Sequence, residues 1–421
     1  MRIAILAIGD ELLNGDQVDT NTTAIARLLA ENGYQIRESI AVGDSIDNIV
    51  AALQRLVQEY EVILVTGGLG PTEDDRTAQA AAKAFGRTLS LNDEALVQIR
   101  ERFAAWGRPM HPRNEKQARL PARSHVLLNR RGTAPGFRLV VNNQATLFFF
   151  PGVPSEMLSM LAEHALPWLH KNDPDPTPLV RRRFTVYGLP EPEVETRLDK
   201  AELPAAVKVA FAVDLPFVHV KLQATGETAG RLIDQAELKA RQALGYAIVG
   251  FGDETLAAVT TRLLITCELS LALAESCTGG MIAQQITDQP GASAILERSA
   301  VTYANSAKQD WLGVSAEILE GVGAVSEECA LAMATGIKAA ADSRVGLAVT
   351  GIAGPTGGTP EKPIGTVYIA MVTDTEQQVE RFCFSGDRQQ VRIRTTCTAL
   401  DWLRRLALLE LASTTEKMRP R

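Results

Sequence analysis

The chain has 421 residues, too many for one ordinary hydrophobic core, which predicts two or three domains. Hydrophobic residues make up 46% of it and charged residues 22%, proportions typical of a globular protein that folds in water. The net charge of −7 argues against a protein that binds nucleic acid irrespective of its sequence. No apolar run approaches the roughly 20 residues of a membrane-spanning helix.

The apolar stretch after Met1 is cut short by Gly9-Asp10-Glu11, so we interpret it as a buried first strand and not as a signal peptide. The five cysteines lie between Cys267 and Cys397, are odd in number and show no CxxC spacing. This usage predicts reduced thiols and a cytoplasmic protein.

The first segment alternates strand and helix patterns. Strands are predicted at Arg2–Ile8, Tyr34–Val42 and Val62–Thr66, with helices at Thr20–Asn32 and Ser45–Glu59 between them. This β-α-β-α-β order predicts a parallel sheet with right-handed crossovers. The elements predicted next are helices at Thr72–Phe85 and Asp93–Trp106, strands at Phe137–Val141 and Thr146–Phe150, and a helix at Ser155–His170.

A proline-rich stretch, Asn172–Pro178, predicts a stiff linker. The small module after it is predicted to hold a strand at Arg182–Tyr187, a helix at Glu191–Ala201, a hairpin of Val207–Val213 with Phe217–Gln223, and a helix at Thr228–Leu244. This order is typical of an α+β module near the minimum size of a domain.

Beyond a boundary at Gly250–Asp253 the pattern becomes α/β again. Helices are predicted at Leu256–Thr266, Ala330–Ala341 and Asp387–Leu411, and strands at Leu269–Ala274, Val345–Thr350, Val367–Val372 and Val379–Phe384. We therefore predict an α/β fold, with two α/β domains of largely parallel sheets, residues 1–171 and 251–421, on either side of a small α+β module, residues 179–250.

A polar turn, Glu275–Gly280, follows the strand Leu269–Ala274 and precedes a helix that begins near Met281. Such a turn can aim the Ser276 hydroxyl and several backbone amides at one bound atom. The last domain contains no histidine, so a base for Ser276 within it must be another residue. Its lysines are few, and a desolvated lysine can lose its proton near neutral pH. Ser276 with Lys308 as base, and Tyr303 as a proton relay or orienting group, forms a coherent amidase-type arrangement.

Two more glycine-bearing turns follow strands of this domain, at Thr350–Gly358 and Phe384–Arg388. Ligands of open α/β sheets bind outside the carboxyl ends of the strands, so the three turns are predicted to line one pocket. Simpler interpretations stay open. Ser276 or Thr278 could be the N-cap of the following helix, and Cys277 is typical of a small buried hydrophobe. A lone lysine such as Lys308 is typical of a solvated helix position, and Arg388 with Arg392 of a surface face.

Two acidic and glycine-bearing turns stand out in the first domain, Gly9–Gly15 and Gly67–Asp75. Successive glycines can form an amide nest for phosphate, and the two acidic clusters could hold a hard divalent cation. Alternatively, Thr72 is the N-cap of the next helix, and the acidic residues that follow it complement the helix dipole.

Six motifs between residues 251 and 411 together resemble the C-terminal domain of the competence/damage-inducible protein A (CinA) family: AESCTGG, VTYANSAK, GAVSE, TGIAGPTGG, KPIGTV and FSGDR. The resemblance implies hydrolysis of the carboxamide of nicotinamide mononucleotide to nicotinic acid mononucleotide and ammonia, without a cofactor. It implies Ser276 as nucleophile, assisted by Lys308 and Tyr303, and amides near Gly279 and Gly280 as the oxyanion site. The expected substrate-binding residues are Thr278, Gly279, Gly280, Thr350, Gly351, Gly354 and Arg388.

The motifs GDELLNG, TGGLGPTEDD, GTAPG and PGVPSEM resemble the molybdopterin-binding-like domain of the same family over residues 1–165. In that family the domain is associated with metal-dependent hydrolysis of ADP-ribose, and in molybdenum-cofactor enzymes a similar domain binds or adenylylates pterin. The residues leave both open. Predicted nucleotide-binding residues are Gly67, Gly68, Gly70, Thr72, Gly132 and Thr133, and predicted ligands of a divalent metal ion are Asp10 and Asp74.

The small module resembles the KH-like domain of full-length CinA proteins, but it lacks a GxxG clamp, so we expect no RNA binding. The resemblance as a whole implies a cytoplasmic homodimer of pyridine nucleotide salvage that recycles NAD, with nicotinamide mononucleotide and ADP-ribose as partners and neither nucleic acid nor membrane. The alternative is a non-catalytic pterin- or nucleotide-binding protein linked to competence or damage response.

Overall fold

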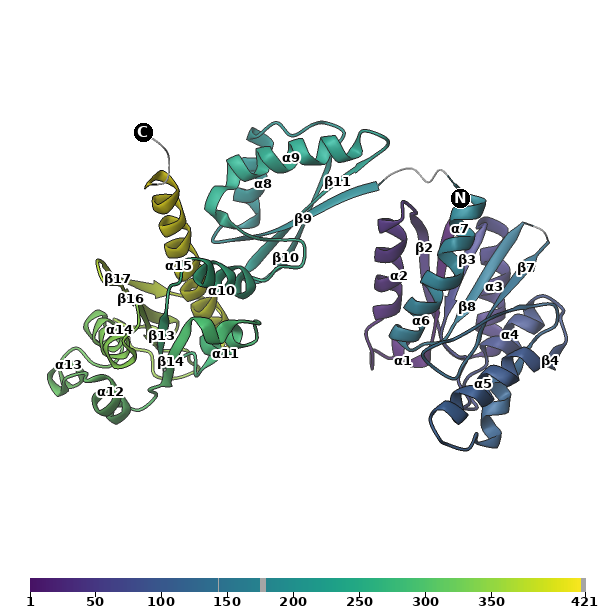
Figure 1. Cartoon of the computed structure of the whole chain (residues 1–421), viewed down its shortest axis with the longest axis horizontal. Coiled ribbons are helices and arrows are strands. Elements are labelled where there is room, and N and C mark those ends of the chain that lie inside the picture. The colour runs from purple at the N-terminus through teal and green to yellow at the C-terminus, as the bar shows by residue number, and fades with distance from the viewer. Residues whose placement is uncertain (143, 175–178, 418–421) are drawn as a thin grey trace. The chain divides into compact units, whose positions relative to one another are not determined.

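The computed structural model of the chain describes residues 1–142, 144–174 and 179–417 (Figure 1). The chain divides into two compact units, Met1–Val180 with Ala224–Gly230, and Arg181–Gln223 with Arg231–Arg421. Most of the small module therefore groups with the C-terminal domain. Residues 175–178 of the predicted linker lie outside the described residues.

The first unit is built on a sheet with the strand order β2-β1-β3-β8-β7-β6. β1 pairs in parallel with both β2 and β3, and β3 pairs in parallel with β8, whereas β7 and β6 are antiparallel. The predicted β-α-β-α-β arrangement is thus confirmed. The strands are β1 (Ile3–Ile8), β2 (Ile36–Val42), β3 (Val62–Thr66), β6 (His125–Leu127), β7 (Gly136–Val141) and β8 (Ala145–Phe150), with a separate pair, β4 (Leu89–Leu91) and β5 (Arg119–Pro121).

Helices cover both faces of this sheet (Figure 1). One face packs on helices α3, α4 and α5, and the other on α2, α6 and α7. Neighbouring residues of β8 serve the two faces: Phe149 stacks on Phe137 in one core, and Phe148 stacks on Phe150 in the other. The helices are α1 (Asp10–Leu13), α2 (Thr20–Glu31), α3 (Ile46–Glu59), α4 (Thr77–Ala84), α5 (Asp93–Ala105), α6 (Pro154–Met160) and α7 (Leu166–Asn172).

Two predicted helices differ from those observed. Helix α4 begins at Thr77 and not at Thr72, because the Thr72 amide and hydroxyl both donate to the Asp75 carboxylate and close a tight turn there. The predicted helix Ser155–His170 is α6 and α7 joined by a short π-helix, Leu161–Ala165.

The small module is a four-stranded sheet of order β10-β11-β9-β12 with two helices. The hairpin of β10 with β11 is confirmed. Strand β12 pairs with β9 and includes Phe251, so the module extends one residue past its predicted end. Its elements are β9 (Leu179–Tyr187), α8 (Glu191–Lys200), β10 (Lys208–Asp214), β11 (Phe217–Thr225), α9 (Ala229–Leu244) and β12 (Ile248–Phe251).

The C-terminal sheet has the order β14-β13-β15-β16-β17. β13 lies between β14 and β15 and is parallel to both, while β16 is antiparallel to β15 and β17. The strands are β13 (Leu271–Glu275), β14 (Leu296–Val301), β15 (Val345–Gly351), β16 (Thr366–Val372) and β17 (Gln377–Cys383), and the helices are α10 (Leu256–Thr266), α11 (Met281–Thr287), α12 (Asn305–Leu312), α13 (Ala316–Glu320), α14 (Glu327–Ala341) and α15 (Arg388–Lys417).

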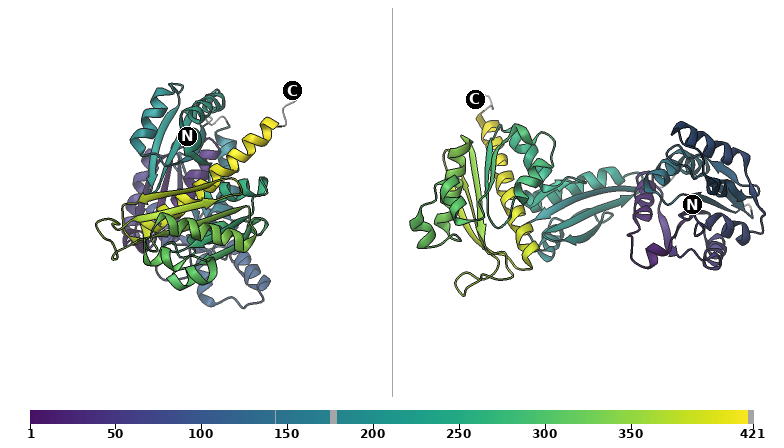
Figure 2. Two further views of the ribbon diagram at one scale, coloured as in Figure 1. Left: turned by 90° about the vertical axis from the view of Figure 1, so that its left-hand side faces the viewer. Right: turned by 90° about the horizontal axis from the view of Figure 1, so that it is seen from below.

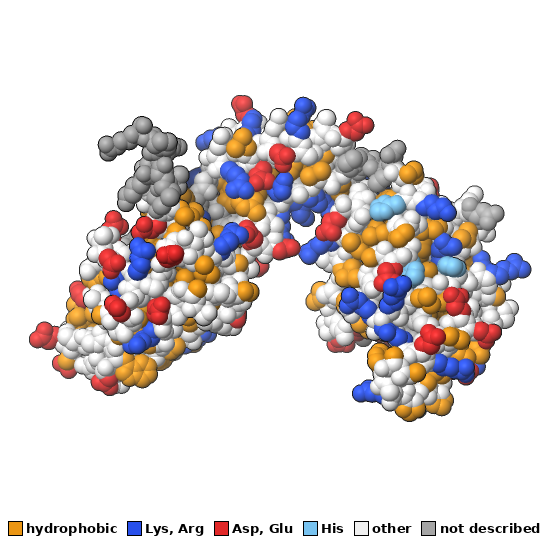
Figure 3. Space-filling view, in the orientation of Figure 1, with side chains coloured by type: hydrophobic (Ala, Val, Ile, Leu, Met, Phe, Trp, Pro, Cys, Tyr) orange, Lys and Arg blue, Asp and Glu red, His pale blue; other side chains and the backbone are white. Residues whose placement is uncertain are grey.

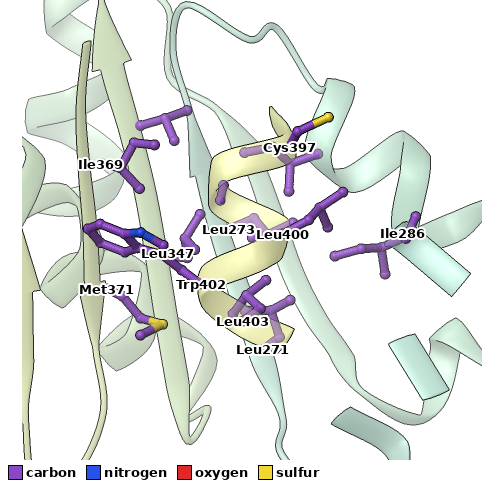
Figure 4. Close-up of a cluster of buried hydrophobic side chains, with 14 of the residues drawn as sticks. Leu271, Leu273, Ile286, Leu347, Ile369, Met371, Cys397, Leu400, Trp402 and Leu403 are labelled. Atoms are coloured by element: carbon purple, nitrogen blue, oxygen red, sulfur yellow. The ribbon is translucent and has the colours of Figure 1, made fainter. Parts of the chain in front are cut away.

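The long helix α15, yellow in Figure 2, packs with α10 and α11 on one face of this sheet. Leu400 and Leu403 of α15 meet Leu271, Leu273 and Leu347 of the sheet (Figure 4). Helices α12 and α14 pack on the opposite face. The carboxyl ends of β13, β14, β15 and β17 consequently share one edge, where the three predicted polar turns begin.

Acidic and basic side chains are interspersed on the faces of both units seen in Figure 3. Within the described part of the chain, no helix is both long and apolar enough to cross a membrane.

Candidate active site

Two adjacent parallel strands bring a serine and a lysine together. Ser276 is the first residue after β13, and β14 leads through Thr302 into α12, whose first turn carries Lys308. The Nζ atom of Lys308 lies 3.3 Å from the Oγ atom of Ser276. Lys308 is only 1% exposed and Ser276 8%, so the solvated-helix interpretation of Lys308 is wrong.

The Lys308 nitrogen has two further partners, the carbonyl oxygens of Thr302 at 2.8 Å and Tyr303 at 3.1 Å. A neutral amine has two N–H groups and one lone pair. If the carbonyls accept the two N–H groups, the lone pair is left facing the Ser276 hydroxyl.

Burial lowers the pKa of Lys308, against smaller opposing effects of the Cys329 and Cys277 thiols. Both thiols are themselves poor acids, because burial raises the pKa of Cys277 to about 12 and also raises the pKa of Cys329. The interpretation of Cys277 as a small buried hydrophobe is confirmed, since it is 5% exposed.

Glu275, which the sequence did not single out, caps the helix after the Ser276 turn. The N-cap of α11 is Gly280 in the left-handed conformation, and no side chain caps the helix from that position. Instead, the Glu275 carboxylate accepts hydrogen bonds from the amides of Gly280 at 3.0 Å, Ile282 at 3.2 Å and Ala283 at 2.8 Å. Neither Ser276 nor Thr278 is the N-cap, and the serine hydroxyl is free of that task.

Both amides that we expected to hold an oxyanion already have acceptors. The Gly279 amide donates to the Ser276 carbonyl at 3.1 Å, and the Gly280 amide donates to Glu275. Among the described residues, no backbone carbonyl accepts from the amides of Cys277 and Thr278, whose partner is the Cys277 sulfur, a weak acceptor. The Thr278 hydroxyl, fully buried, has no partner there.

The first residues of α15 tie the three polar turns together. Arg388 donates to the Gly354 carbonyl at 2.8 Å and to the Tyr303 hydroxyl at 3.1 Å. Arg392 donates twice to the Thr278 carbonyl, at 3.2 and 2.7 Å. Both guanidinium groups therefore bind the turns from the surface of the domain, where Arg388 is exposed and Arg392 is half-buried.

Two different groups of Tyr303, its backbone carbonyl and its side-chain hydroxyl, make contacts in the site. Its carbonyl binds Lys308, whereas its side chain is 61% exposed and its hydroxyl meets Arg388. Among the contacts of the described residues, the phenol has none with Ser276 or Lys308.

Two further predicted substrate-binding residues, Thr350 and Gly351, also have structural contacts. The Thr350 hydroxyl is buried and donates to the Ala324 carbonyl at 2.7 Å. At Gly351, a Cβ atom would come within 2.7 Å of the Val367 side chain and 2.8 Å of the Thr366 carbonyl, so close strand packing accounts for the glycine.

The first unit has a separate cavity of about 550 Å³ at the carboxyl ends of its parallel strands. Of the predicted nucleotide-binding residues, Gly67, Gly68, Gly70 and Thr133 line it, and Thr72 and Gly132 do not. Further lining residues that the sequence analysis left out of the site include Asn21, Asp44 and Glu156.

Of the two predicted metal ligands, Asp74 lines this cavity and Asp10 does not. The carboxylates of Asp10 and Asp44 each accept the other's backbone amide at 3.0 Å. Burial, followed by the charges of Asp10, Glu11 and Asp74, raises the pKa of Asp44. No three His, Cys, Asp or Glu side chains of the described residues form a metal-binding group on their own. The carboxylates of Asp44 and Asp74 at this cavity are oxygen ligands of the kind that suit a hard cation shared with ligand phosphates, as Mg²⁺ often is.

Comparisons with known proteins agree over most of the chain. The family model for the CinA C-terminal domain matches residues 253–407, and that for the probable molybdopterin binding domain matches residues 4–171. A CinA-like protein of Syntrophotalea carbinolica is 55% identical over 405 residues, which cover 96% of this chain and 98% of the relative. A CinA-like protein of Geobacter metallireducens is 46% identical over 97% of this chain and 100% of its own length. Among solved structures, the competence/damage inducible protein CihA of Agrobacterium tumefaciens is 40% identical, covering 36% of this chain and 94% of its own, with a TM-score of 0.35.

Proposed function

This chain belongs to the CinA family, and from that premise we propose that its C-terminal domain hydrolyses the carboxamide of nicotinamide mononucleotide with Ser276 as the nucleophile. One observation carries the proposal: a buried lysine nitrogen lies 3.3 Å from a serine hydroxyl at the carboxyl edge of an α/β sheet. A buried amine with a lowered pKa is a suitable base for such a serine.

The reaction begins when neutral Lys308 takes the hydroxyl proton as Ser276 Oγ bonds to the carboxamide carbon. The tetrahedral intermediate collapses with cleavage of the carbon–nitrogen bond, and Lys308 returns the proton to the departing ammonia. The ester left on Ser276 is then attacked by water, whose proton passes through Lys308 back to the serine oxygen. The products are the free acid and ammonia, and no metal or other cofactor enters the balance.

The developing oxyanion needs donors that are not already engaged by an oxygen acceptor. We assign this role to the amides of Cys277 and Thr278, because among the described residues their partner is only the Cys277 sulfur, a weak acceptor. The amide of the residue directly after the nucleophile is a common oxyanion donor in serine hydrolases. Arg388, anchored by the Gly354 carbonyl and the Tyr303 hydroxyl, has further N–H groups that can bind the substrate phosphate.

The test is ammonia release from nicotinamide mononucleotide by the full chain, with and without a chelator. We expect release that resists the chelator and is lost in Ser276→Ala. The matched control is Ser270→Ala, because Ser270 precedes the opposite end of β13 and its hydroxyl accepts the Arg344 amide. Activity that survives in Ser276→Ala would overturn the nucleophile, and tight nucleotide binding without turnover would favour the non-catalytic alternative.

For the first unit we propose a second activity, metal-dependent hydrolysis of the pyrophosphate bond of ADP-ribose. What favours it is the cavity at the glycine turn, lined by Gly68, Asp44 and Asp74. Asp44 and Asp74 would hold the metal ion together with the substrate phosphates, and the ion would supply charge neutralisation at the pyrophosphate. AMP release with Mg²⁺ should stop with chelator and in Asp44→Asn, but not in Asp47→Asn, whose carboxylate pairs with Lys83 at the surface. Pterin binding without ADP-ribose hydrolysis would favour the molybdenum-cofactor alternative.

We also propose a cytoplasmic homodimer. Its mass in solution, measured by light scattering, tests the oligomeric state.

A further inference from the structure

We propose that Glu275 and Arg392 are positioning residues that hold the Ser276 turn from two sides. They fix Ser276 Oγ against Lys308 Nζ without touching the substrate. The inference rests on the proposed amidase function, because the geometry that they hold is that of the nucleophile and its base.

Glu275 holds the turn from within. Its side chain is fully buried, and none of the ion pairs seen among the described residues includes it. Its charge is instead compensated by the three amides of Gly280, Ile282 and Ala283, which a helix N-terminus leaves without intrahelical partners. Because Glu275 directly precedes Ser276, these bonds attach the start of α11 to the residue next to the nucleophile.

The amides that Glu275 occupies are consequently unavailable to a ligand. Helix α11 therefore supports the turn, and we exclude the amides of Gly280, Ile282 and Ala283 from the binding of the oxyanion or the phosphate. This separates the turn into amides with an oxygen acceptor, those of Ser276, Gly279 and Gly280, and the amides of Cys277 and Thr278, which have only the Cys277 sulfur as partner among the described residues.

Arg392 holds the turn from outside. Its Nε and terminal nitrogen both donate to the Thr278 carbonyl, two residues after the nucleophile. The neighbouring Val391 is fully buried in the core under α15, so the backbone from which the Arg392 side chain extends is held in place. A Cβ atom on Gly279 would lie 3.4 Å from the same guanidinium group, so Arg392 covers the outer side of the turn closely.

The contact between Lys308 and Ser276, which these residues hold, tolerates little displacement. At 3.3 Å, the distance between Lys308 Nζ and Ser276 Oγ is already long for a hydrogen bond. A further displacement of about 1 Å would separate nucleophile and base and can reduce turnover by about 100-fold. Substrate binding through Arg388 would be spared, so the loss should fall on kcat and leave KM nearly unchanged.

The experiment compares Glu275→Gln and Arg392→Gln with Thr255→Ala. Thr255 caps α10 in the same core through the Ala258 amide, so it is a matched loss of a helix cap away from the turn. For each protein we would measure kcat, KM and the rate at which a fluorophosphonate probe labels Ser276, all per folded molecule. The probe reports on the nucleophile independently of the carboxamide substrate.

Both glutamine variants should lose about 10- to 100-fold in kcat and in labelling rate, with KM within about threefold, whereas Thr255→Ala should lose only thermal stability. Wild-type kcat and labelling in Arg392→Gln would overturn the proposal even if Glu275→Gln does not fold. A raised KM at unchanged kcat would place Arg392 on the substrate and overturn it too. Failure of the proposed function looks different: wild type would release no ammonia, or Ser276→Ala would remain active.

Discussion

Lys308 meets Ser276 across 32 residues of sequence because each follows one of two neighbouring parallel strands, β13 and β14. The sheet holds the two strand ends side by side, and the two carbonyls at the end of β14 direct the lysine nitrogen. The positions of the proposed nucleophile and base thus depend on the sheet and not on a flexible loop.

Replacing Lys308 by arginine should abolish the amidase while keeping a positive charge at the site. Arginine remains protonated, so it cannot take the Ser276 proton, and a general base contributes about 10²- to 10⁴-fold to the rate. Ammonia release measures the loss. Lys338→Arg is the control, because Lys338 pairs with Asp374 at the surface. Substantial activity in Lys308→Arg would show that another group is the base.

The pH dependence of kcat/KM should follow Lys308. Because the neutral amine is the active form, the rate rises as the pH rises through the lowered pKa of Lys308, with an inflection below the ordinary lysine value of 10.5. The neighbouring thiols stay protonated over this range, since the pKa of Cys277 is about 12 and that of Cys329 is raised. A rate that falls with pH in this range would contradict the assignment.

Stability should also titrate with Lys308. The folded pKa lies below the unfolded one, so between the two values the unfolded chain binds more protons, and the free energy of unfolding rises with pH. Lys308→Met removes this titration. The Tm of wild type minus that of Lys308→Met should therefore increase with pH, up to about pH 10, in thermal unfolding scans. A flat difference would mean that Lys308 is not desolvated in the folded state.

Tyr303→Phe should cost little in kcat. The phenylalanine variant keeps the carbonyl that binds Lys308 and loses only the hydroxyl that meets Arg388. We expect less than about a tenfold loss in kcat and a raised KM, against the 10²- to 10⁴-fold loss of a group that transfers a proton. Steady-state kinetics measure both, with the exposed Tyr246→Phe as control. A loss of the larger size would restore the phenol as a proton relay.

The buried ion pair of α15 should matter for folding. Arg404 is 3% exposed, donates to Asp401 and reaches the Tyr246 carbonyl of the small module at 2.5 Å. Arg404→Leu leaves the Tyr246 carbonyl without this donor and Asp401 with only the half-exposed Arg405 as its pair, and removing one partner of a buried pair costs about 3 kcal/mol. Urea unfolding measures the change. Arg262→Ala, which breaks a surface pair with Glu254, should change the free energy of unfolding little.

Strand and turn patterns were enough to predict the α/β fold and the place of Ser276. The scarcity of lysines in the last domain was enough to select Lys308, although its burial depends on packing that no local pattern encodes. Glu275 could not be found in this way, because its reach to the α11 amides depends on Gly279 and Gly280, both at positive φ.

Asp44 could have been found. It follows β2, which is parallel to β1, so its carboxylate had to lie at the same sheet edge as the acidic turn after β1. The helix start at Thr72 was wrong for a different reason. A good N-cap residue also forms tight turns, and the carboxylate of Asp75 decided between the two.

Helix α15 carries Arg388 and Arg392 near its start, where they bind carbonyls of the polar turns. Further along the same helix, Arg404 binds a carbonyl of the small module. The twelve residues from Arg392 to Arg404 span about 18 Å of continuous helix. Such a helix moves as one rigid element. A tilt of the small module against the sheet would therefore displace Arg392, and with it the Ser276 turn that Arg392 covers.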